Sequence, residues 1–438
     1  MITSVIGRTF LDAFNAKYTK DYSPKEFFEK EYWELFYNHE KYMQWVTNSP
    51  FVQMKKGQKP HLLTDSERVE KLEALEEKIL QMTPDASFAL GYPASEVKEY
   101  ASTSGLVSDL DIPVDKDEVY LSWIGSGLGI GVAGGFTILF DNVDIVLKTY
   151  EGWRSYRQFL NDPTLVKLRG NQINSWNGQW LAYTMNPTKY KEDFDFNILS
   201  QEGFFKLDAN TVEMSTVPWS RLFFSLSNHY PDSEMMSHVY GFGQTNKTIG
   251  FIPFQFKSGR KIKDVYHKLF GDQSIDQSDF ENLFGMHIKR ACELGSIGLL
   301  ALRPQQLEKY MHEGKSLSLK KEEDLITYYA YKTWLKAMLS RNKEEITDYT
   351  MELAAVIKRY RAAGSKLDRK TLIEKELFAS AGKRGFIESL CKMIKDLEGA
   401  DLLTIKELKD EVHLMTNEEY TYFCTLVKFD YTFLERQS

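Results

Sequence analysis

This sequence has few cysteines and none of the spacings that hold metals. Its 438 residues include three cysteines, Cys292, Cys391 and Cys424, which are widely separated and odd in number. Such a set excludes a disulfide framework and favours a reducing compartment, so we expect core thiols. The opening MITSVIGRTFLDAFNAKY lacks a basic region followed by a small-residue cleavage site. The sequence therefore predicts a cytoplasmic protein.

Signatures of metal-assisted and covalent catalysis are also missing. The eight histidines form no His-x-x-x-His pair and no His-Glu-x-x-His helix, and no Gly-x-Ser-x-Gly elbow occurs. His229 and His238 are the nearest pair with acids between them, and the segment reads more readily as a loop than as an accessory metal site. We therefore expect a binding protein with no catalytic residue, metal or cofactor.

Basic residues are fewer than acidic ones, 55 Lys and Arg against 62 Asp and Glu. The formal net charge is -7, with 42% hydrophobic and 14% aromatic residues. This composition excludes a disordered chain and allows a large core. Because the bulk charge repels polyanions, a nucleic-acid site would have to be a local basic patch.

The periodicity along the chain predicts the α+β class. Residues 1–310 read as an irregular mixed α/β body, helical over 1–85 and β-rich over 92–304, and residues 311–438 as an antiparallel helical bundle. Capping boxes are expected at Ser23 with Glu26, Thr64 with Glu67, and Thr416 with Glu419. The segments expected as strands are VYLSWI, GFTILF, GQWLAYTM, RLFFSLS, HVYGFG and TIGFIPFQF.

An uncharged run extends from Val119 to Phe140, which is long enough to span a bilayer. Its six glycines, the acidic residues on both sides and the absence of a Lys/Arg bias favour a buried glycine-rich hairpin instead. Gly129, Gly131 and Gly134 also have Gly-x-Gly-x-x-Gly spacing. A dinucleotide site needs a helix next, whereas FTILF prefers strand. A tight turn is favoured over a nucleotide site or a phosphate nest at Gly125–Gly135.

The region from Val356 to Lys395 is the most basic one. It has eleven basic residues against four acids, a local charge of +7, so the remainder of the chain carries about -14. Such a patch suits a phosphate backbone, although a solvated lysine-rich helix face has the same composition. The residues that we single out here are Lys358, Arg359, Arg361, Arg369, Lys370, Lys383 and Arg384.

Polar segments with aromatic neighbours supply further candidates. Asn171–Trp180 (NQINSWNGQW) contains Asn174 and Asn177, and Gly243–Thr248 (GQTNKT) contains Gln244, Asn246 and Lys247. Amides can pair with adenine edges, lysine can reach guanine or phosphate, and tryptophan can stack on bases. The same residues are common in structural turns, which remain the alternative interpretation.

In order along the chain, these features resemble the large subunit of type I CRISPR interference complexes (Cascade), most closely the type I-B branch. The resemblance is carried by GRTFLDAFNAKYTKDYSPKEFF, by VTNSPFV at Val46–Val52, by the glycine-rich run leading into ILFDNVDIVLK, by NSWNGQW and by the closing helices. The Cys-x-x-Cys pairs common in that branch are missing, so a zinc-stabilised subdomain is absent or is rebuilt by the glycine-rich run. No position of this sequence matches a residue with which that family reads the DNA motif.

The resemblance implies a subunit that reads the short motif beside a DNA target, holds the displaced strand and recruits a helicase-nuclease. Its partners would be guide RNA, target DNA and the other Cascade subunits, with no membrane contact. We expect the basic loop containing Asn48, Lys55, Lys56 and Lys59, or the loop Gln244–Lys247, to approach duplex DNA. The alternative is a small-molecule enzyme that binds a phosphate or nucleotide at the Gly125–Gly135 turn.

Overall fold

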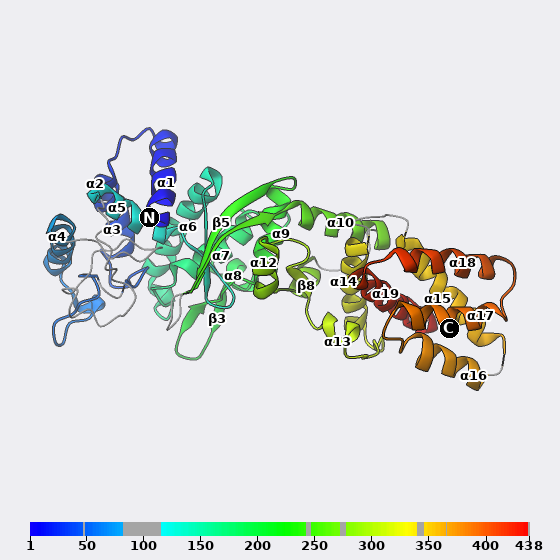
Figure 1. Ribbon diagram of the computed structural model, residues 1–438. Coiled ribbons are helices and arrows are strands. Elements are labelled where there is room, and N and C mark those ends of the chain that lie inside the picture. The colour runs from blue at the N-terminus through cyan, green and yellow to red at the C-terminus, as the bar shows by residue number, and fades with distance from the viewer. Residues whose placement is uncertain are drawn as a thin grey trace. The chain divides into compact units, whose positions relative to one another are not determined.

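The computed structural model describes residues 1–46, 49–81, 115–241, 247–271, 277–339, 346–364 and 366–436. The chain divides into two compact units, Met1–Phe256 and Lys257–Ser438. Helices dominate both, and antiparallel strands form a few small sheets, which confirms the α+β class and the helical C-terminal region (Figure 1).

The described part of the first unit contains nine α-helices and six strands. The helices are α1 (Ile2–Tyr18), α2 (Pro24–Phe27) running through a π-helix (Phe28–Tyr32) into α3 (Trp33–Phe36), α4 (Asp65–Gln81), α5 (Lys116–Gly127), α6 (Val143–Asn161), α7 (Ile173–Thr184), α8 (Phe196–Gln201) and α9 (Trp219–His229). The strands are β1 (Ile130–Val132), β2 (Phe136–Phe140), β3 (Phe205–Leu207), β4 (Val212–Met214), β5 (Glu234–Gly241) and β6 (Lys247–Gln255). Strands β1, β2, β5 and β6 pair in that order, all antiparallel, and β3 pairs with β4.

The helix starts follow the predicted capping chemistry. The Glu26 N–H donates to Ser23 Oγ at 3.3 Å, and the Glu26 carboxylate accepts the Ser23 N–H at 3.0 Å. The same reciprocal bonds form between Thr64 and Glu67 and between Thr416 and Glu419. All three predicted capping boxes are therefore confirmed. The first of these helices ends at Phe36.

Aromatic side chains fill the core of the first unit, which accounts for their high share of the sequence. Tyr32 stacks on Phe36 with ring centroids 4.1 Å apart, and Trp153 meets Phe36 edge-on at 4.8 Å. Phe10 and Trp123 are fully buried in the same cluster. Rings of this size bury large apolar areas and gain further from tilted and stacked contacts.

Helices α1 and α5 cross with their backbones in contact. A Cβ atom at Gly7 would lie 2.0 Å from the Leu121 carbonyl oxygen, and one at Gly125 would lie 1.9 Å from the Thr3 carbonyl oxygen. The Thr3 and Ser122 hydroxyls hydrogen-bond at 2.6 Å across this crossing. Only glycine allows so close an approach, so part of the glycine-rich run serves helix packing.

The uncharged run is split between α5 and the β1–β2 hairpin. Gly134 and Gly135 turn the hairpin at φ of 90° and 76°, which confirms the predicted tight turn. In the residues that the structure describes, none of the helices has the length and apolarity needed to cross a bilayer.

Three of the six segments expected as strands are helices, and those predictions were wrong. VYLSWI lies in α5, GQWLAYTM in α7 and RLFFSLS in α9, whereas GFTILF, HVYG and TIGFIPFQ lie in β2, β5 and β6. Most residues of α5 and α7 are buried, so that neither helix has one distinct apolar face. A helix buried on all sides lacks the alternation of polar and apolar faces by which it is recognised in sequence.

The second unit consists of a helical bundle and the elements that precede it. The helices are α10 (Lys257–Phe270), α11 (Gln277–Asn282), α12 (Ile288–Leu294), α13 (Leu307–Met311), α14 (Glu322–Leu339), α15 (Ile346–Ala362), α16 (Lys366–Thr371) continued by a π-helix (Leu372–Leu377), α17 (Lys383–Ile394), α18 (Gly399–Leu414) and α19 (Asn417–Arg436). Strands β7 (Phe284–Met286) and β8 (Leu302–Pro304) form a short antiparallel pair.

The predicted boundary at residue 310 lies inside this second unit, because residues 257–310 pack on the bundle. Phe270 of α10 contacts Tyr329 of α14 with centroids 4.2 Å apart. The buried Trp334 indole of α14 donates to the carbonyls of Leu299 and Leu302, at 3.0 Å each. Residues 257–310 therefore contribute to the core of the second unit.

Candidate functional site

The basic loop, residues 49–63 between α3 and α4, is fixed on its own unit. Phe51 is buried and stacks on Tyr37 with centroids 4.0 Å apart. From α4, Lys71 Nζ donates to the carbonyls of Pro50 and Gln53, the first at 3.1 Å. Arg68 of the same helix donates to the carbonyls of Pro60 and Leu63, at 3.3 and 3.2 Å. The loop backbone therefore has a defined conformation.

Three lysines project from this loop. Lys55, Lys56 and Lys59 are all exposed. Within the described part of the chain, none of their ammonium groups forms a hydrogen bond or ion pair; Lys55 contributes only its backbone N–H, which donates to Gln58 Oε1 at 3.0 Å. The nearby Glu67 carboxylate accepts from the Thr64 N–H and from Gln58 Nε2, and its pKa is lowered first by the Thr64 bond and least by the charge of Lys55. These cations are thus available to an external anion.

An aromatic side chain lies just before the loop. Trp45 is 45% exposed. Tyr42, three residues earlier, is buried, and the centroids of the two rings lie 6.4 Å apart. An exposed indole offers a face on which a base can stack. The sequence interpretation missed Trp45, although the combination of tryptophan and a lysine-rich loop within fifteen residues was a usable signal.

The amide nitrogens of Asn174 and Asn177 donate to backbone carbonyls of the first unit. Asn177 is fully buried, and its Nδ2 donates to the carbonyls of Gly127 and Gly129 at 2.7 and 2.9 Å. Asn174 Nδ2 also donates to the Gly129 carbonyl, at 2.9 Å. Both residues lie on α7 and hold the end of α5 and the start of β1. The segment is therefore neither a surface turn nor a base-reading loop.

Other predicted contacts cannot be placed. Asn48, Gln244 and Asn246 lie outside the described residues. Lys247 is the first residue of β6, where its backbone pairs with Gly241.

The cations of the bundle form ion pairs within the bundle. Arg359 binds Asp401 through two hydrogen bonds, Nε to Oδ2 at 3.0 Å and Nη2 to Oδ1 at 2.5 Å. The hydrogen bonding from Arg359 is the main cause that lowers the pKa of Asp401. Arg361 pairs with Glu435 and donates to the Tyr431 hydroxyl at 2.6 Å.

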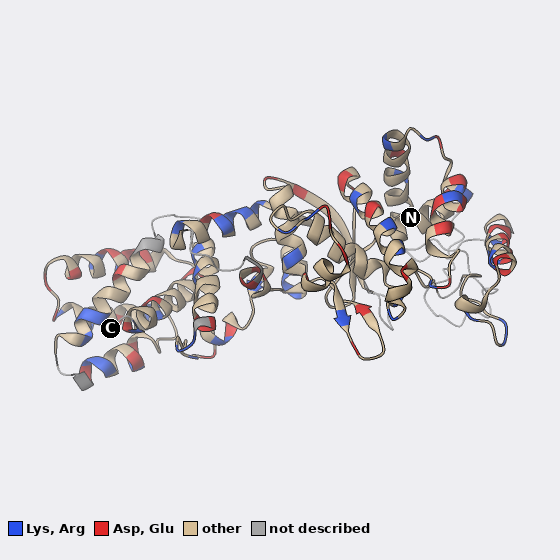
Figure 2. Cartoon of the chain, turned by 180° about the vertical axis from the view of Figure 1, so that it is seen from behind, with Lys and Arg blue, Asp and Glu red and all other residues tan. Residues whose placement is uncertain are grey.

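Most of the remaining bundle cations are also engaged. Arg369 lies 4.4 Å from the centroid of the Tyr360 ring, and its Nη2 is 3.4 Å from Asp396. Three more ion pairs join Lys370 to Glu374 at 3.8 Å, Arg384 to Glu388 at 2.9 Å, and Lys392 to Glu376. Lys358 donates to the Leu434 carbonyl and Lys383 to the Met415 carbonyl. Figure 2 shows basic residues next to acidic ones along these helices. The bundle thus has a mixed-charge surface, which weakens the case for a polyphosphate site there.

The glycine turn offers no free phosphate cradle. The Gly129 N–H donates to the Ser126 carbonyl at 3.1 Å, and the Ala133 N–H donates to the Val217 carbonyl at 2.9 Å. A Cβ at Gly131 would lie 2.9 Å from the Asn174 backbone, so α7 already covers this side. Strand β2 follows the turn, and there is no helix N-terminus to bind a pyrophosphate.

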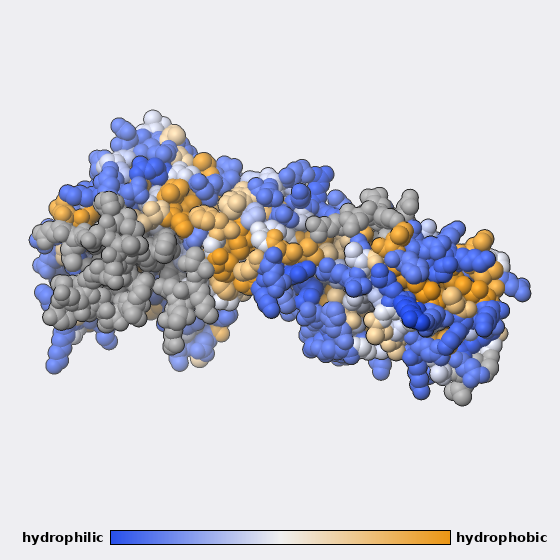
Figure 3. All heavy atoms as spheres, in the orientation of Figure 1, coloured by the Kyte–Doolittle hydropathy of each residue, from blue (hydrophilic) through white to orange (hydrophobic). Residues whose placement is uncertain are grey.

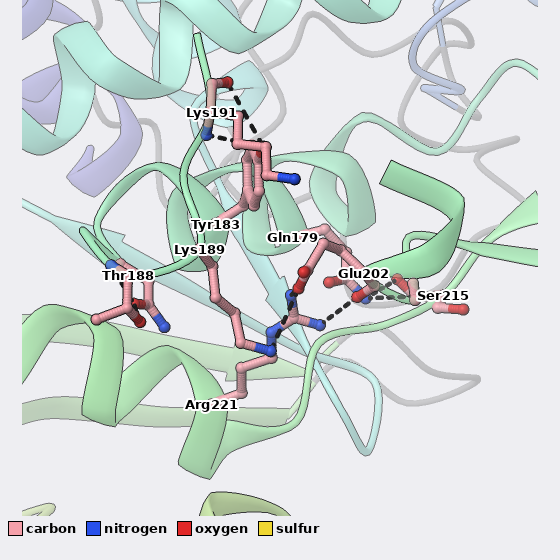
Figure 4. A network of polar contacts seen from close by, with 10 residues as sticks. Gln179, Tyr183, Thr188, Lys189, Lys191, Glu202, Ser215 and Arg221 are labelled. Atoms are coloured by element: carbon pink, nitrogen blue, oxygen red, sulfur yellow. Dashed lines mark hydrogen bonds and ion pairs between the residues drawn. The ribbon is translucent and has the colours of Figure 1, made fainter. Parts of the chain in front are cut away.

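Two further polar sites have charged groups that pair with one another. On the first unit, Glu202 accepts from Lys189 Nζ at 3.3 Å and from Arg221 Nη2 at 3.4 Å, which ties the loop after α7 to α9 (Figure 4). The second unit has a cavity of about 540 Å³ lined by His287, Lys289, Arg290, Glu293, Leu300, Arg303, Glu308, Met311, His312, Trp334, Asn417, Glu418, Thr421 and Tyr422. Its arginines pair with its own glutamates.

Metal and thiol chemistry have no obvious site in the described ranges. No group of three or more His, Cys, Asp or Glu side chains there is arranged to hold a metal ion. His229 ends α9 and His238 is buried on β5, so the segment between them is not the simple loop expected.

Cys292 and Cys391 are exposed, contrary to the core thiols predicted. Only Cys424 is largely enclosed, and burial raises its pKa to about 12.

Apolar side chains are dispersed over the surface. On the face drawn in Figure 3, apolar residues emerge in several areas separated by hydrophilic ones. The most exposed of the large apolar residues are Leu414, Val166 and Leu207. Val166 and Leu207 lie on neighbouring segments of the first unit, because Lys167 and Leu207 both pair with Val212, whereas Leu414 lies on α18 of the second unit.

Comparisons with known proteins leave the chain without a family. No family model matches it, no curated protein is similar to it, and no solved structure resembles it.

Proposed function

We propose that this protein binds nucleic acid and that the basic loop is its main contact with the phosphate backbone. The observation that carries the proposal is the group of three exposed lysines, Lys55, Lys56 and Lys59, whose ammonium groups have no partner within the described residues. They stand on a loop that is anchored by Arg68 and Lys71. The exposed Trp45 adds a stacking surface in the same region of the sequence.

Whether its cations are already paired determines which surface, the basic loop or the bundle, binds a phosphate more readily. A paired arginine such as Arg359 has to give up a carboxylate before it can bind a phosphate. An unpaired lysine loses only water and releases the counterions of the phosphate that it neutralises. The three loop lysines are therefore worth more to a polyanion than the more numerous cations of the bundle.

The finer proposal rests on the resemblance to the large subunit of type I CRISPR complexes. In that role the chain would recognise target DNA beside the sequence matched by a guide RNA and would hold the displaced strand. It would act together with the other Cascade subunits and recruit a helicase-nuclease. The loop lysines would then position the duplex, because phosphate contacts fix register without reading bases.

Two measurements test the proposal at its two levels. The purified chain should bind a fluorescein-labelled 30-base-pair duplex in anisotropy titrations, with an affinity that falls steeply from about 50 to 200 mM KCl. Purification from the native host should recover a short RNA and further subunits with the chain. Absence of DNA binding at low salt would contradict the proposal that the chain binds nucleic acid. DNA binding without copurified RNA would contradict only the CRISPR role.

A charge-reversal variant locates the contact. Lys55→Glu, Lys56→Glu and Lys59→Glu together should lower the slope of log affinity against log salt by about 2 to 3, since each phosphate contact contributes about 0.9. The matched control reverses Lys20, Lys116 and Lys206, which are exposed lysines of the same unit. It makes the same change in net charge and should leave most of the slope in place.

A further inference from the structure

The cavity of the second unit has an aromatic floor. Residues of α12, β8, α13, α14 and the first turns of α19 line it. Trp334 and Tyr422 meet edge-on in its wall, with ring centroids 5.2 Å apart, and Leu300 and Met311 add apolar surface. Its volume of about 540 Å³ is in the range that holds a ligand as large as a mononucleotide. A flat ring can pack against such a floor.

The charges in the cavity wall balance one another. The wall has three cations and three carboxylates, namely Lys289, Arg290 and Arg303, and Glu293, Glu308 and Glu418. Arg290 lies 3.4 Å from both Glu293 and Glu418, and Arg303 lies 2.9 Å from Glu308. An anion that entered the cavity would meet carboxylates as well as cations. A neutral polar ligand is therefore favoured.

Arg303 has single N–H donors to offer but no free pair of parallel ones. Such a pair always includes Nη2, as where Arg359 binds Asp401 through Nε and Nη2. In Arg303, Nη2 donates to His287 Nε2 at 2.8 Å and lies 2.9 Å from Glu308 Oε1. Phosphates and carboxylates bind arginine best through the parallel pair. The remaining Nε and Nη1 form no hydrogen bond with another described residue, and single donors of this kind suit a carbonyl oxygen.

Glu308 supplies an acceptor beside these donors. Its Oε1 atom contacts Arg303, while Oε2 forms no hydrogen bond or ion pair within the described part of the chain. A ligand in which a carbonyl stands next to an N–H would thus meet a donor and an acceptor side by side. Guanine has this edge, because its O6 atom accepts while N1–H and the adjacent amino group donate. Adenine has the reverse order, with an amino group beside an unprotonated nitrogen.

We propose that this cavity binds a guanine base, with O6 on Arg303, N1–H on Glu308 and the ring against the aromatic floor. A free guanine nucleotide and an unpaired guanine of a strand present the same edge, so both are sources of the base. The inference goes beyond the proposed function, because it uses the edge of a base and none of the loop lysines. It also concerns the other unit of the chain.

Isothermal titration calorimetry of the full chain with GMP and with AMP tests the proposal. The two nucleotides carry the same phosphate and differ in the edge of the base. We expect GMP to bind with a Kd of about 1 mM or lower and AMP to bind at least about tenfold more weakly. Equal affinities, or no detectable binding of GMP, would overturn the inference. This comparison needs no variant.

A substitution of Glu308 tests the assigned contact. In Glu308→Gln the amide oxygen stays with Arg303, and the amide N–H then faces the N1–H of guanine. The affinity for GMP should fall at least about tenfold, whereas that for AMP should stay within about twofold. Glu313→Gln makes the same change in charge at an exposed position outside the cavity and should bind GMP like the wild type. Undiminished preference for GMP in Glu308→Gln would also overturn the inference.

Two labelled strands separate the sources of the base. One is a 12-nucleotide oligo-dA and the other has a single guanine at its centre. Tighter binding of the guanine strand in anisotropy titrations, lost in Glu308→Gln, assigns the base to a strand. Equal binding of the two strands by a protein that binds GMP assigns it to a free nucleotide.

The outcomes also distinguish this inference from the proposed function. The variant that reverses Lys55, Lys56 and Lys59 should keep the preference for GMP over AMP. A wild-type protein that binds the duplex but does not distinguish GMP from AMP overturns the inference alone. One that prefers GMP but does not bind the duplex overturns the proposed function alone.

Discussion

At the scale of single residues, glycines set how closely α1 and α5 approach. Replacing Gly7 by alanine would place a Cβ 2.0 Å from a backbone oxygen that cannot move without shifting α5. Overpacking of this kind outweighs the gain of about 1 kcal/mol that alanine brings to a helix interior.

Gly7→Ala should therefore lower the free energy of unfolding by about 2 kcal/mol or more. Urea titration followed by circular dichroism measures this change. Val5→Ala is the control on the same helix, because Val5 is 52% exposed and should change stability by less than about 0.5 kcal/mol. Equal stability of Gly7→Ala and the wild type would refute the backbone contact.

A buried polar group joins three helices of the second unit. Asp430 of α19 is fully buried and accepts from Lys332 Nζ at 2.5 Å, from the Tyr328 hydroxyl at 3.0 Å and from the Thr350 hydroxyl at 3.0 Å. Burial and the Asp430 charge raise the pKa of Tyr328, so its hydroxyl remains a donor.

Asp430→Ala leaves Lys332 buried without its carboxylate and should cost about 3–5 kcal/mol. The double variant Lys332→Met with Asp430→Leu removes both charges and should be more stable than the single variant. Denaturant titration of the two proteins gives the comparison. A single variant that is no less stable than the double one would contradict the network.

The imidazole of His39 is held neutral in the first unit. Its Nδ1 accepts the Lys41 N–H at 2.9 Å, and burial and then the Arg157 charge lower its pKa to about 4. The lesser electrostatic influences come from Glu40 and Arg68. Since the unfolded chain binds this proton at a pKa near 6.5, protonation favours unfolding.

The stability that depends on His39 should be complete above pH 6.5 and should decline as the pH falls towards 4. The decline has an upper limit of about 1.4 kcal/mol per pH unit and is smaller here, because the ring is partly exposed. Unfolding measured across this range in the wild type and in His39→Asn isolates the effect. Parallel pH profiles would show that His39 does not contribute.

At the scale of elements, ion pairs join the bundle helices. Arg359 of α15 and Asp401 of α18 form a bidentate pair. Arg359→Asp should destabilise the second unit by about 1 kcal/mol, and the exchange Arg359→Asp with Asp401→Arg should restore much of the loss.

The same Arg359 variants also distinguish structure from binding. Their salt slope for the labelled duplex should equal that of the wild type, because the guanidinium is already occupied. Anisotropy titration measures it. A slope lower by about 1 would show that this arginine contacts a phosphate after all.

The sequence predicted elements best where a local rule was sufficient. Ser23, Thr64 and Thr416 marked helix starts because capping depends on residues only three positions apart. It failed for α5 and α7, because burial on most sides removes the helical alternation of polar and apolar residues.

The candidate site was only partly predictable for the same reason. Lys55, Lys56 and Lys59 follow from composition, since a polar loop stays on the surface. The pairing of Arg359 with Asp401 joins positions 42 residues apart, and the burial of Asn177 depends on carbonyls 48 and 50 residues earlier. Neither long-range contact has a local signal.

At the scale of the whole molecule, charge distinguishes two kinds of basic surface. Six of the eleven basic residues between Val356 and Lys395 are in ion pairs, whereas the ammonium groups of the three loop lysines form no hydrogen bond or ion pair within the described residues. The location of the bound strand, more than its affinity, is the central claim.

Lysine acetylation footprinting measures that location directly. Brief acetylation with and without a saturating 30-base-pair duplex, read by mass spectrometry, gives the reactivity of each lysine. The account predicts that DNA protects Lys55, Lys56 and Lys59 several-fold and leaves Lys315, Lys320 and Lys321 unchanged. Full reactivity of the three loop lysines in the DNA-bound protein would contradict it.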